Sequence, residues 1–155
     1  MDVLTPQQRH LNMSRIRGKN TKPERVLREG LHALGLRFRL HARTLPGRPD
    51  LVFPKYRAAV FVHGCFWHGH GCQLSTTPAT RRAFWTKKIL DTRKRDTRAA
   101  LTLNEAGWRV LTVWECGLRG RHRWPIQDLL AACELFIRQG AGGSVEISRY
   151  PGASR

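Results

Sequence analysis

The chain has no long hydrophobic run, since no apolar stretch approaches the roughly 18 to 20 residues that a membrane-spanning helix needs. Its first residues also lack the charged and then apolar pattern of a secretory signal peptide. No internal repeat is visible. We therefore expect a soluble cytoplasmic protein without a membrane partner.

Acidic residues are also scarce. Eleven Asp and Glu stand against 28 Lys and Arg, which gives a formal net charge of +17. So basic a balance predicts a polyanionic partner, with nucleic acid first and a cationic membrane-surface protein or a ribosomal-type RNA binder as the alternatives. With 155 residues, 41% of them apolar, the chain is long enough for one globular domain with a hydrophobic core.

Cysteine is limited to four residues. Two disulfides would be possible in a secreted protein, but no secretion signal is present, and three of the cysteines lie near histidines or an acidic residue. Reduced thiols that bind a metal ion are the favoured interpretation. Cys133 is the exception, because it falls on the apolar face of a predicted helix and is expected to be an inert core thiol.

Hydrophobic spacing predicts an α/β domain with a mixed sheet flanked by helices. A capping box, Thr21 followed by Glu24, begins a helix that Gly35 ends. Short apolar runs predict four strands, and the segments after the third and the fourth strand fit helices. The expected strands are 36–40, 51–53, 58–62 and 108–114, with one or two basic helices over 80–106 and a closing helix over 126–137.

The segment 62–72 reads VHGCFWHGHGC and is the densest chemical motif of the chain. Cys65, His70 and Cys72 are three zinc-type ligands, and Cys116, at the end of a distant strand, can supply the fourth. Such a closed Cys3His set is typical of structural zinc. The alternative is a set of buried thiols with chance histidines.

Asp50 begins an apolar strand about a dozen residues before His63. A carboxylate in that position can hold magnesium against a scissile phosphate, although Pro49-Asp50 alone is also a turn signal. His63 and His68 are left for proton transfer or for phosphate contacts. Glu24 is explained by the capping box, but it could still face the metal from the first helix.

Adjacent aromatics at Phe66 and Trp67, and Trp85 at the start of a basic segment, offer apolar wedges for insertion between bases. Core packing is the alternative for each of them. Basic side chains of the same segment would follow the phosphate backbone, although a charge run is often only a solvated face. These are Arg81, Arg82, Lys87, Lys88, Arg93, Lys94, Arg95 and Arg98.

Three strings, LPGRPD at 45–50, VHGCFWH at 62–68 and VWEC at 113–116, together resemble the very short patch repair (Vsr) endonucleases. Asn12-Met13 and Thr21-x-x-Glu24 extend the match, so that it covers about residues 10–138. The resemblance implies a restriction-endonuclease-like fold with a structural zinc. It further implies a magnesium-dependent nick 5′ to the thymine of a T:G mismatch, the product of 5-methylcytosine deamination.

The resemblance also implies roles for individual residues. Asp50 would be the magnesium carboxylate, with His68 and His63 as catalytic histidines and Glu24 in support. The implied zinc ligands are Cys65, His70, Cys72 and Cys116. The implied DNA-contacting residues are Met13, Phe66, Trp67 and Trp85.

The second strand departs from the usual pattern of this fold, which has an acidic residue and a lysine there. This chain has Val62 and His63, and a better-known member of the family has threonine in place of Val62. A backbone carbonyl near Val62 would then serve the magnesium ion, and a histidine would replace the lysine.

On this basis residues 1–20 are expected to be a basic DNA-contacting arm, 21–140 the nuclease domain and 141–155 a flexible tail. The expected partner is mismatched double-stranded DNA, bound by a monomer in the bacterial cytoplasm at the nucleoid, and the resemblance adds mismatch-repair proteins. Two other functions stay open, a non-enzymatic zinc-containing nucleic-acid-binding protein and a restriction-like nuclease without mismatch preference.

Overall fold

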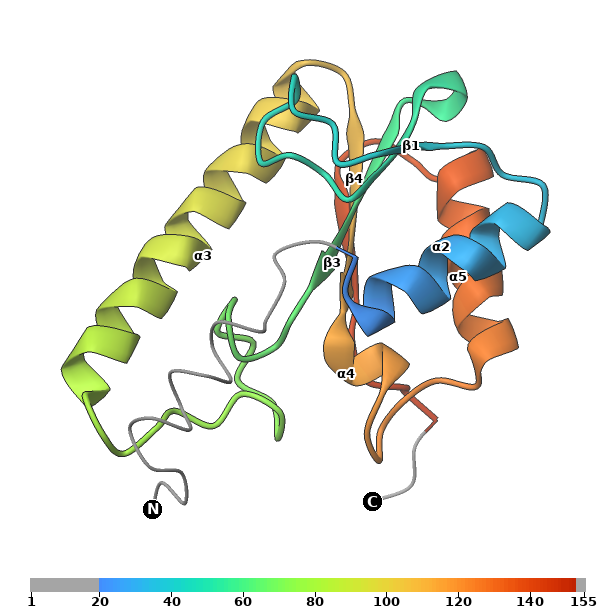
Figure 1. The fold of residues 1–155 in the computed structure, drawn as a ribbon. Helices are drawn as coiled ribbons and strands as arrows, with labels where there is room; N and C mark the ends of the chain where they lie inside the picture. The colour runs from blue at the N-terminus through green and yellow to red at the C-terminus, as the bar shows by residue number, and fades with distance from the viewer. Residues whose placement is uncertain (1–19, 153–155) are drawn as a thin grey trace.

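A mixed five-stranded sheet runs through the computed structural model, which describes residues 20–152 (Figure 1). The spatial order of the strands is β1-β2-β3-β4-β5. The first two pairings are antiparallel, and the β3–β4 and β4–β5 pairings are parallel. The strand bounds are β1 Arg39–Leu40, β2 Leu51–Phe53, β3 Ala58–His63, β4 Arg109–Trp114 and β5 Ser144–Ile147.

Helices cover both faces of this sheet, so the predicted α/β architecture with a mixed sheet is confirmed. Helices α2 (Lys22–Ala33) and α5 (Ile126–Gln139) lie on one face, and α3 (Arg82–Glu105) lies on the other (Figure 1). Two short helical segments, η1 (Pro54–Tyr56) and α4 (Glu115–Leu118), follow β2 and β4.

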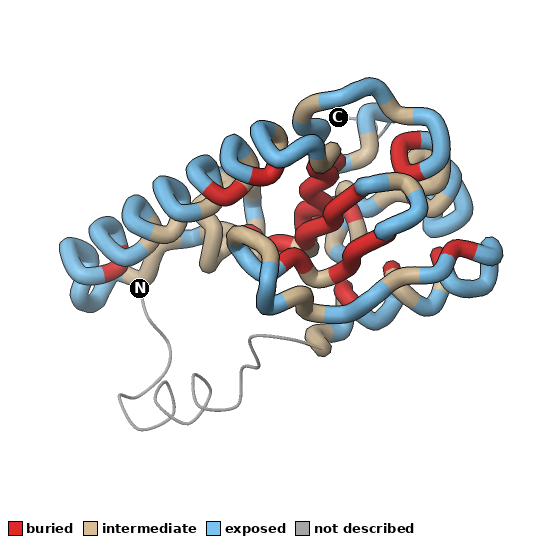
Figure 2. The backbone as a smooth tube through the Cα atoms, turned by 90° about the horizontal axis from the view of Figure 1, so that it is seen from above, coloured by how far each residue is buried: buried red, intermediate tan, exposed pale blue. Residues whose placement is uncertain are grey.

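Side-chain alternation on the central strands divides the core into two layers. On β3, Val60 packs toward α2 and α5, whereas Phe61 packs toward Leu103 of α3. Both central strands are almost continuously buried, as expected for strands that are covered on both faces. Figure 2 shows the buried positions gathered in the strands, with only short buried stretches on α3.

Helix α2 begins and ends as the sequence predicts. Thr21 is the N-cap, and its hydroxyl accepts a hydrogen bond from the Glu24 amide at 3.4 Å. At the other end Gly35 has φ +90°, and the Leu36 amide donates back to the Leu31 carbonyl at 3.2 Å. This helix therefore holds Glu24 in its first turn, turned into the protein with 1% of its surface exposed.

The prediction of a flexible tail over residues 141–155 is wrong in its first half, because Ser144–Ile147 forms the edge strand β5. This strand pairs with β4 in parallel, with Val110 opposite Ser144 and Val113 opposite Ile147. Ile147 is buried against the sheet and supplies the apolar contact. The first predicted strand is also shorter than expected, since only Arg39–Leu40 pairs with β2.

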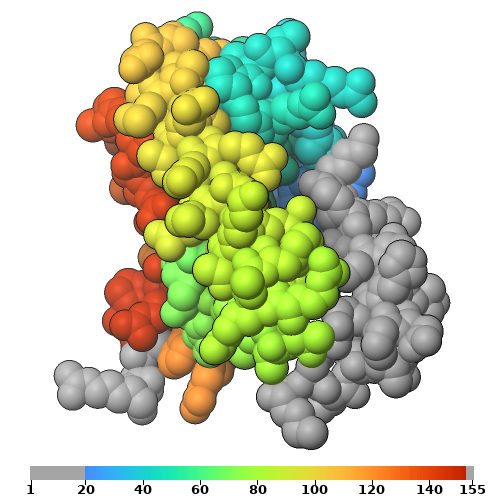
Figure 3. Space-filling view, turned by 90° about the vertical axis from the view of Figure 1, so that its left-hand side faces the viewer, coloured from blue at the N-terminus to red at the C-terminus, as the bar shows by residue number. Residues whose placement is uncertain are grey.

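Helix α3 is a single helix of 24 residues, and it lies within the segment 80–106 for which the sequence predicts one or two helices. Trp85, Ala99 and Leu103 are its buried residues, so most of its surface faces solvent. It forms the outer wall of the side of the molecule seen in Figure 3. Among the described residues, no helix is both long enough and apolar enough to cross a membrane.

Candidate active site and metal cluster

Two neighbouring strand ends deliver most of the candidate functional residues. Strands β3 and β4 run in parallel with His63 opposite Trp114, so the residues that follow each strand leave the sheet at the same edge. Cys65 follows β3, and Cys116 lies in α4 directly after β4. Residues 51 positions apart in sequence thereby come into contact.

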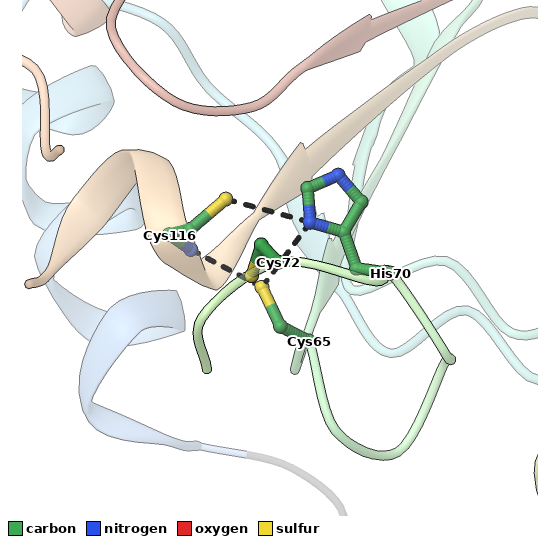
Figure 4. A group of neighbouring side chains, drawn as sticks. All are labelled: Cys65, His70, Cys72 and Cys116. Carbon is green, nitrogen blue, oxygen red and sulfur yellow. Dashed lines mark hydrogen bonds between the residues drawn. The ribbon is translucent and has the colours of Figure 1, made fainter. Parts of the chain in front are cut away.

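Four candidate zinc ligands meet at this edge (Figure 4). Their ligand atoms all lie within 4.8 Å of one another. The His70 Nδ1 atom is 3.6 Å from the Cys65 Sγ and 3.5 Å from the Cys116 Sγ. The group consists of Cys65, His70, Cys72 and Cys116, the set that the sequence predicts, whereas Cys133 is buried in the main core.

Two of these sulfurs accept hydrogen bonds from backbone amides, but burial disfavours the ionisation of Cys65 and Cys116. The Cys116 amide donates to the Cys65 Sγ at 3.3 Å, and the Leu74 amide donates to the Cys72 Sγ at 3.4 Å. Burial raises the pKa of the Cys116 thiol to about 11 and raises that of Cys65 further. A bound cation would offset this cost of ionisation, so the cluster could hold a metal ion such as zinc.

A second group is formed by carboxylates on the α2 side of the sheet. Asp50 lies just before β2, and its Oδ2 accepts a hydrogen bond from the Val62 amide of β3 at 2.7 Å. Glu24 and His41 complete the group, with one ligand atom of each residue within 4.8 Å of the others. The structure thus brings Asp50 and Glu24 together. Of Val62, it is the backbone amide that contacts Asp50.

Glu24 has three hydrogen-bond partners. Its Oε2 lies 3.0 Å from Arg28 Nη1 and 3.0 Å from His41 Nε2. Its Oε1 accepts from the Asn20 amide at 3.3 Å. A buried carboxylate with this many polar partners is held in a fixed orientation.

Asp50 is the carboxylate with the most perturbed acidity. Burial raises the pKa of Asp50 to about 7, the Val62 amide opposes this rise, and the nearby Glu24 carboxylate adds to it. Two carboxylates this close, one of them buried, repel each other when both are ionised. A divalent cation would remove that repulsion, so the donor set fits an ion of this kind.

His63 and His68 form a third group on the α3 side, where β3 ends. Their rings stack with centroids 3.7 Å apart and an angle of 1° between the planes. His68 Nδ1 lies 2.5 Å from Asp96 Oδ2, and His63 Nδ1 lies 4.0 Å from the same oxygen. The carboxylate group and the histidine pair therefore flank the last residues of β3 from opposite faces of the sheet.

The histidine pair lines a cavity of about 690 Å³ between α3 and the sheet. Burial lowers the pKa of His63 to about 3; the neighbouring His68 also lowers it, and Asp96 acts in the opposite direction. Gly69 allows the loop to approach α3, because it has φ +62° and a Cβ at this position would collide with Ile89. This close approach brings His68 within reach of Asp96 on the helix.

The aromatic residues form a cluster beside the histidine loop. Phe66 and Trp67 lie with ring centroids 5.0 Å apart and are half-buried. Trp85, only 8% exposed, packs against both, at 5.4 Å from Phe66 and 5.8 Å from Trp67. Trp85 therefore supports the other two rings, and a direct DNA contact by Trp85 stays a prediction.

The predicted phosphate-contacting residues lie at the start of α3 and along its solvent-facing surface. All eight are exposed, so none serves as a core residue. Met13, the remaining predicted DNA contact, lies outside the described residues. The eight are Arg81, Arg82, Lys87, Lys88, Arg93, Lys94, Arg95 and Arg98.

Sequence reasoning missed Asp96, His41 and Arg28. Asp96 had a usable signal, since it is the one acidic residue in the string RKRDTR. His41 had none, because a single histidine between a short strand and a turn carries no pattern. Arg28 lies one turn after Glu24 on α2, a spacing that could have suggested the ion pair.

Comparison with known proteins gives a consistent set of relatives. The family described as DNA mismatch endonuclease Vsr matches residues 1–74. The type II nicking enzyme V.XorIIP of Xanthomonas oryzae is 50% identical over 117 residues, which cover 76% of this chain and 86% of that protein. DNA mismatch endonuclease Vsr of Escherichia coli is 45% identical over 146 residues, which cover 94% of this chain and 93% of that protein. The type II nicking enzyme V.NmeAIP of Neisseria meningitidis is 38% identical over 120 residues, which cover 77% of this chain and 86% of that protein.

Proposed function

The chain belongs to the Vsr family and is a DNA-nicking endonuclease, and we propose that it cuts the thymine strand 5′ to the thymine of a T:G mismatch, with Mg²⁺ as cofactor. The observation that carries this proposal is the convergence of Asp50 and the His63–His68 pair at the end of one strand. The fold is proposed to be of the restriction-endonuclease type. The biological substrate is proposed to arise by deamination of 5-methylcytosine.

Asp50 is the proposed magnesium carboxylate, with the Val62 backbone carbonyl as a second ligand. Magnesium, when bound, would neutralise charge on the scissile phosphate and activate a water molecule. The Val62 amide fixes the Asp50 carboxylate through the 2.7 Å hydrogen bond. Glu24 acts in support, since its negative charge lies against Asp50 and increases the attraction of the site for a cation.

His68 is the proposed proton-transfer residue. Its Nδ1 faces Asp96, which orients the ring and leaves Nε2 free to exchange a proton with the substrate. Asp96 acts through His68 and is therefore a positioning residue. His63 is buried and its ring stacks on that of His68. We propose that it holds the His68 ring in place and contacts the phosphate as a neutral hydrogen-bonding group.

The Cys3His cluster is proposed to bind a structural zinc ion. Cys65 and Cys72 lie on either side of Phe66, Trp67 and His68 in sequence. Fixing both flanks restricts the segment between them. The zinc would then position the aromatic wedge and the catalytic histidine together.

Mismatch recognition is assigned to Phe66 and Trp67, with Met13 and Trp85 as further contacts. A wedge of apolar side chains separates bases at a cost that is smaller for a mispaired step than for a paired one. Phe66 and Trp67 suit this role because their rings are partly exposed and rest on buried Trp85.

Strand-specific nicking of paired duplexes tests the proposal. The duplexes differ only in a central T:G or T:A pair and are incubated with Mg²⁺ or with EDTA. We expect a Mg²⁺-dependent nick 5′ to the mismatched thymine, and its loss by a factor of at least about 10³ in Asp50→Asn. Equal cutting of both duplexes would indicate a nuclease without mismatch preference, and tight binding without cutting would indicate a binding protein.

A further inference from the structure

His41 faces the two carboxylates of the candidate magnesium site, although neither the zinc cluster nor the catalytic histidine pair uses it. Its Nε2 lies 3.0 Å from Glu24 Oε2. One ligand atom from each of His41, Glu24 and Asp50 falls within 4.8 Å of the other two. Ligands about 2.1 Å from a common ion are separated by roughly 3 to 4.2 Å, so one ion could reach all three with small side-chain movements.

The β1–β2 hairpin holds His41 in this place. Leu40 pairs with Leu51, and the His41 amide then donates to the Asp50 carbonyl at 3.1 Å, so the two residues stand opposite each other on the hairpin. His41 has φ +50°, in the left-handed region that few side-chain-bearing residues adopt. This backbone turn ends the strand and directs the imidazole toward Glu24.

The charge balance of the group favours an added cation. Glu24 is 1% exposed, and one of its carboxylate oxygens lies within 4.8 Å of one from Asp50. Arg28 is the one fixed positive charge bonded to either carboxylate within the described residues, and it approaches Glu24 alone. Asp50 therefore has no charged partner of its own there, and a cation between the carboxylates would provide one.

We propose that His41 is a ligand of the cation that Asp50 and Glu24 hold, so that the site is a mixed nitrogen and oxygen site that binds Mn²⁺ or Co²⁺ more tightly than Mg²⁺. The inference rests on the proposed function, because it concerns the same cation site. Mg²⁺ takes oxygen ligands almost exclusively, whereas an imidazole nitrogen adds affinity for later first-row ions. His41 thus increases the preference of the site for these ions over Mg²⁺.

Direct metal binding tests this role without any cleavage assay. The full chain, with its Cys3His cluster loaded with zinc, is titrated with Mn²⁺, and free Mn²⁺ is measured by electron paramagnetic resonance. Mg²⁺ affinity is obtained by competition. We expect Mn²⁺ to bind at least about tenfold more tightly than Mg²⁺, with electron spin echo modulation from a coordinated nitrogen that changes when histidine is ¹⁵N-labelled.

Three variants assign that nitrogen. His41→Gln keeps a hydrogen-bond donor for Glu24 and should lose the modulation, with Mn²⁺ binding weakened about tenfold and Mg²⁺ binding changed less than about twofold. His32→Gln, an exposed histidine on α2, is the matched control and should behave as wild type. Asp50→Asn should abolish binding of both ions.

The possible failures are distinguishable. Asp50-dependent Mn²⁺ binding without nitrogen modulation, or an equal loss of Mn²⁺ and Mg²⁺ affinity in His41→Gln, overturns the ligand role and leaves the proposed function intact. Absence of any Asp50-dependent binding overturns both. If His41→Gln does not fold, the ¹⁵N-histidine measurement on wild type, compared with Asp50→Asn, decides the question.

Discussion

At the scale of single residues, a few polar side chains in this protein are buried or paired against the general trend of the chain. Asp96 lies among arginines and lysines on α3, yet its carboxylate forms a hydrogen bond with His68 in the loop after β3. Glu24 is a capping residue by sequence, yet its carboxylate has three hydrogen-bond partners inside the protein. In both cases the side chain makes a contact that its own helix does not require.

Asp96→Asn should slow single-turnover nicking about 10²-fold while mismatch binding changes less than about twofold, because the amide can no longer orient His68 as a carboxylate does. The pH profile of the remaining activity should also shift. Asp91→Asn, an exposed acid on the same helix, is the control and should retain wild-type rates. A variant rate within threefold of wild type would contradict the positioning role.

Cys133 gives a pH dependence to stability. Burial raises its thiol pKa from 9.0 to about 12, so between these values the unfolded chain releases a proton that the folded chain keeps. Stability is thus full below about pH 9 and falls above it, by up to about 1.4 kcal/mol per pH unit.

Urea denaturation between pH 8 and 10.5 measures this effect. Cys133→Ala should show a free energy of unfolding that falls less steeply with pH than wild type, by up to about 1.4 kcal/mol per unit. Parallel slopes for the two proteins would show that the thiol does not contribute.

Individual site residues were predictable where a motif carried them and not where folding alone did. The Cys3His set was visible because three members lie within eight residues. His41 was invisible because its place depends on the β1–β2 hairpin and a left-handed backbone. Asp96 meets His68 only because α3 crosses the loop, a long-range arrangement that local spacing does not encode.

At the scale of elements, the loop after β3 is tied to α4 by the Cys3His cluster. His70 also stacks on Trp114 at the end of β4, with centroids 4.2 Å apart. The central strands and long helices were predictable because continuous apolar runs and helical periodicity are local signals. β5 was missed because its Gly- and Ser-rich surroundings predict a loose chain, and its pairing with β4 is not a local property.

Removing zinc with a chelator should lower the thermal unfolding midpoint by about 10 °C, because free zinc at a thousandfold its Kd contributes about 4 kcal/mol. Tryptophan fluorescence should change at the same time, since Trp114 stacks on His70. Cys116→Ser should be destabilised and insensitive to the chelator, whereas Cys133→Ala should keep the wild-type response. A midpoint unaffected by chelation would argue against a structural metal.

At the scale of the whole molecule, charge is distributed unevenly between the two helical layers. Helix α3 presents its basic residues to solvent on one side of the sheet, whereas α2 and α5 pack on the other side around the main apolar core. The proposed catalytic groups flank the end of β3 from the two faces of the sheet. Composition alone predicted the polyanionic partner, but not which face carries the charge.

Affinity for DNA should fall steeply with salt, by about 10³-fold or more between 50 and 200 mM if six or more phosphates are contacted. In Lys94→Ala, the slope of log K against log salt concentration should decrease in magnitude by about one. Binding to matched and mismatched duplexes should weaken by the same factor. Fluorescence anisotropy with both duplexes measures this. Binding that is unchanged across that range would rule out a phosphate-tracking surface.

In the loop between Cys65 and Cys72, neighbouring residues belong to different functional groups. Cys65 belongs to the cluster, Phe66 and Trp67 to the aromatic group, His68 to the Asp96 pair and His70 again to the cluster. The spacing of these residues therefore constrains the length of the loop. Inserting or deleting a single residue would shift each later side chain into its neighbour's position and so disturb more than one of these groups at once.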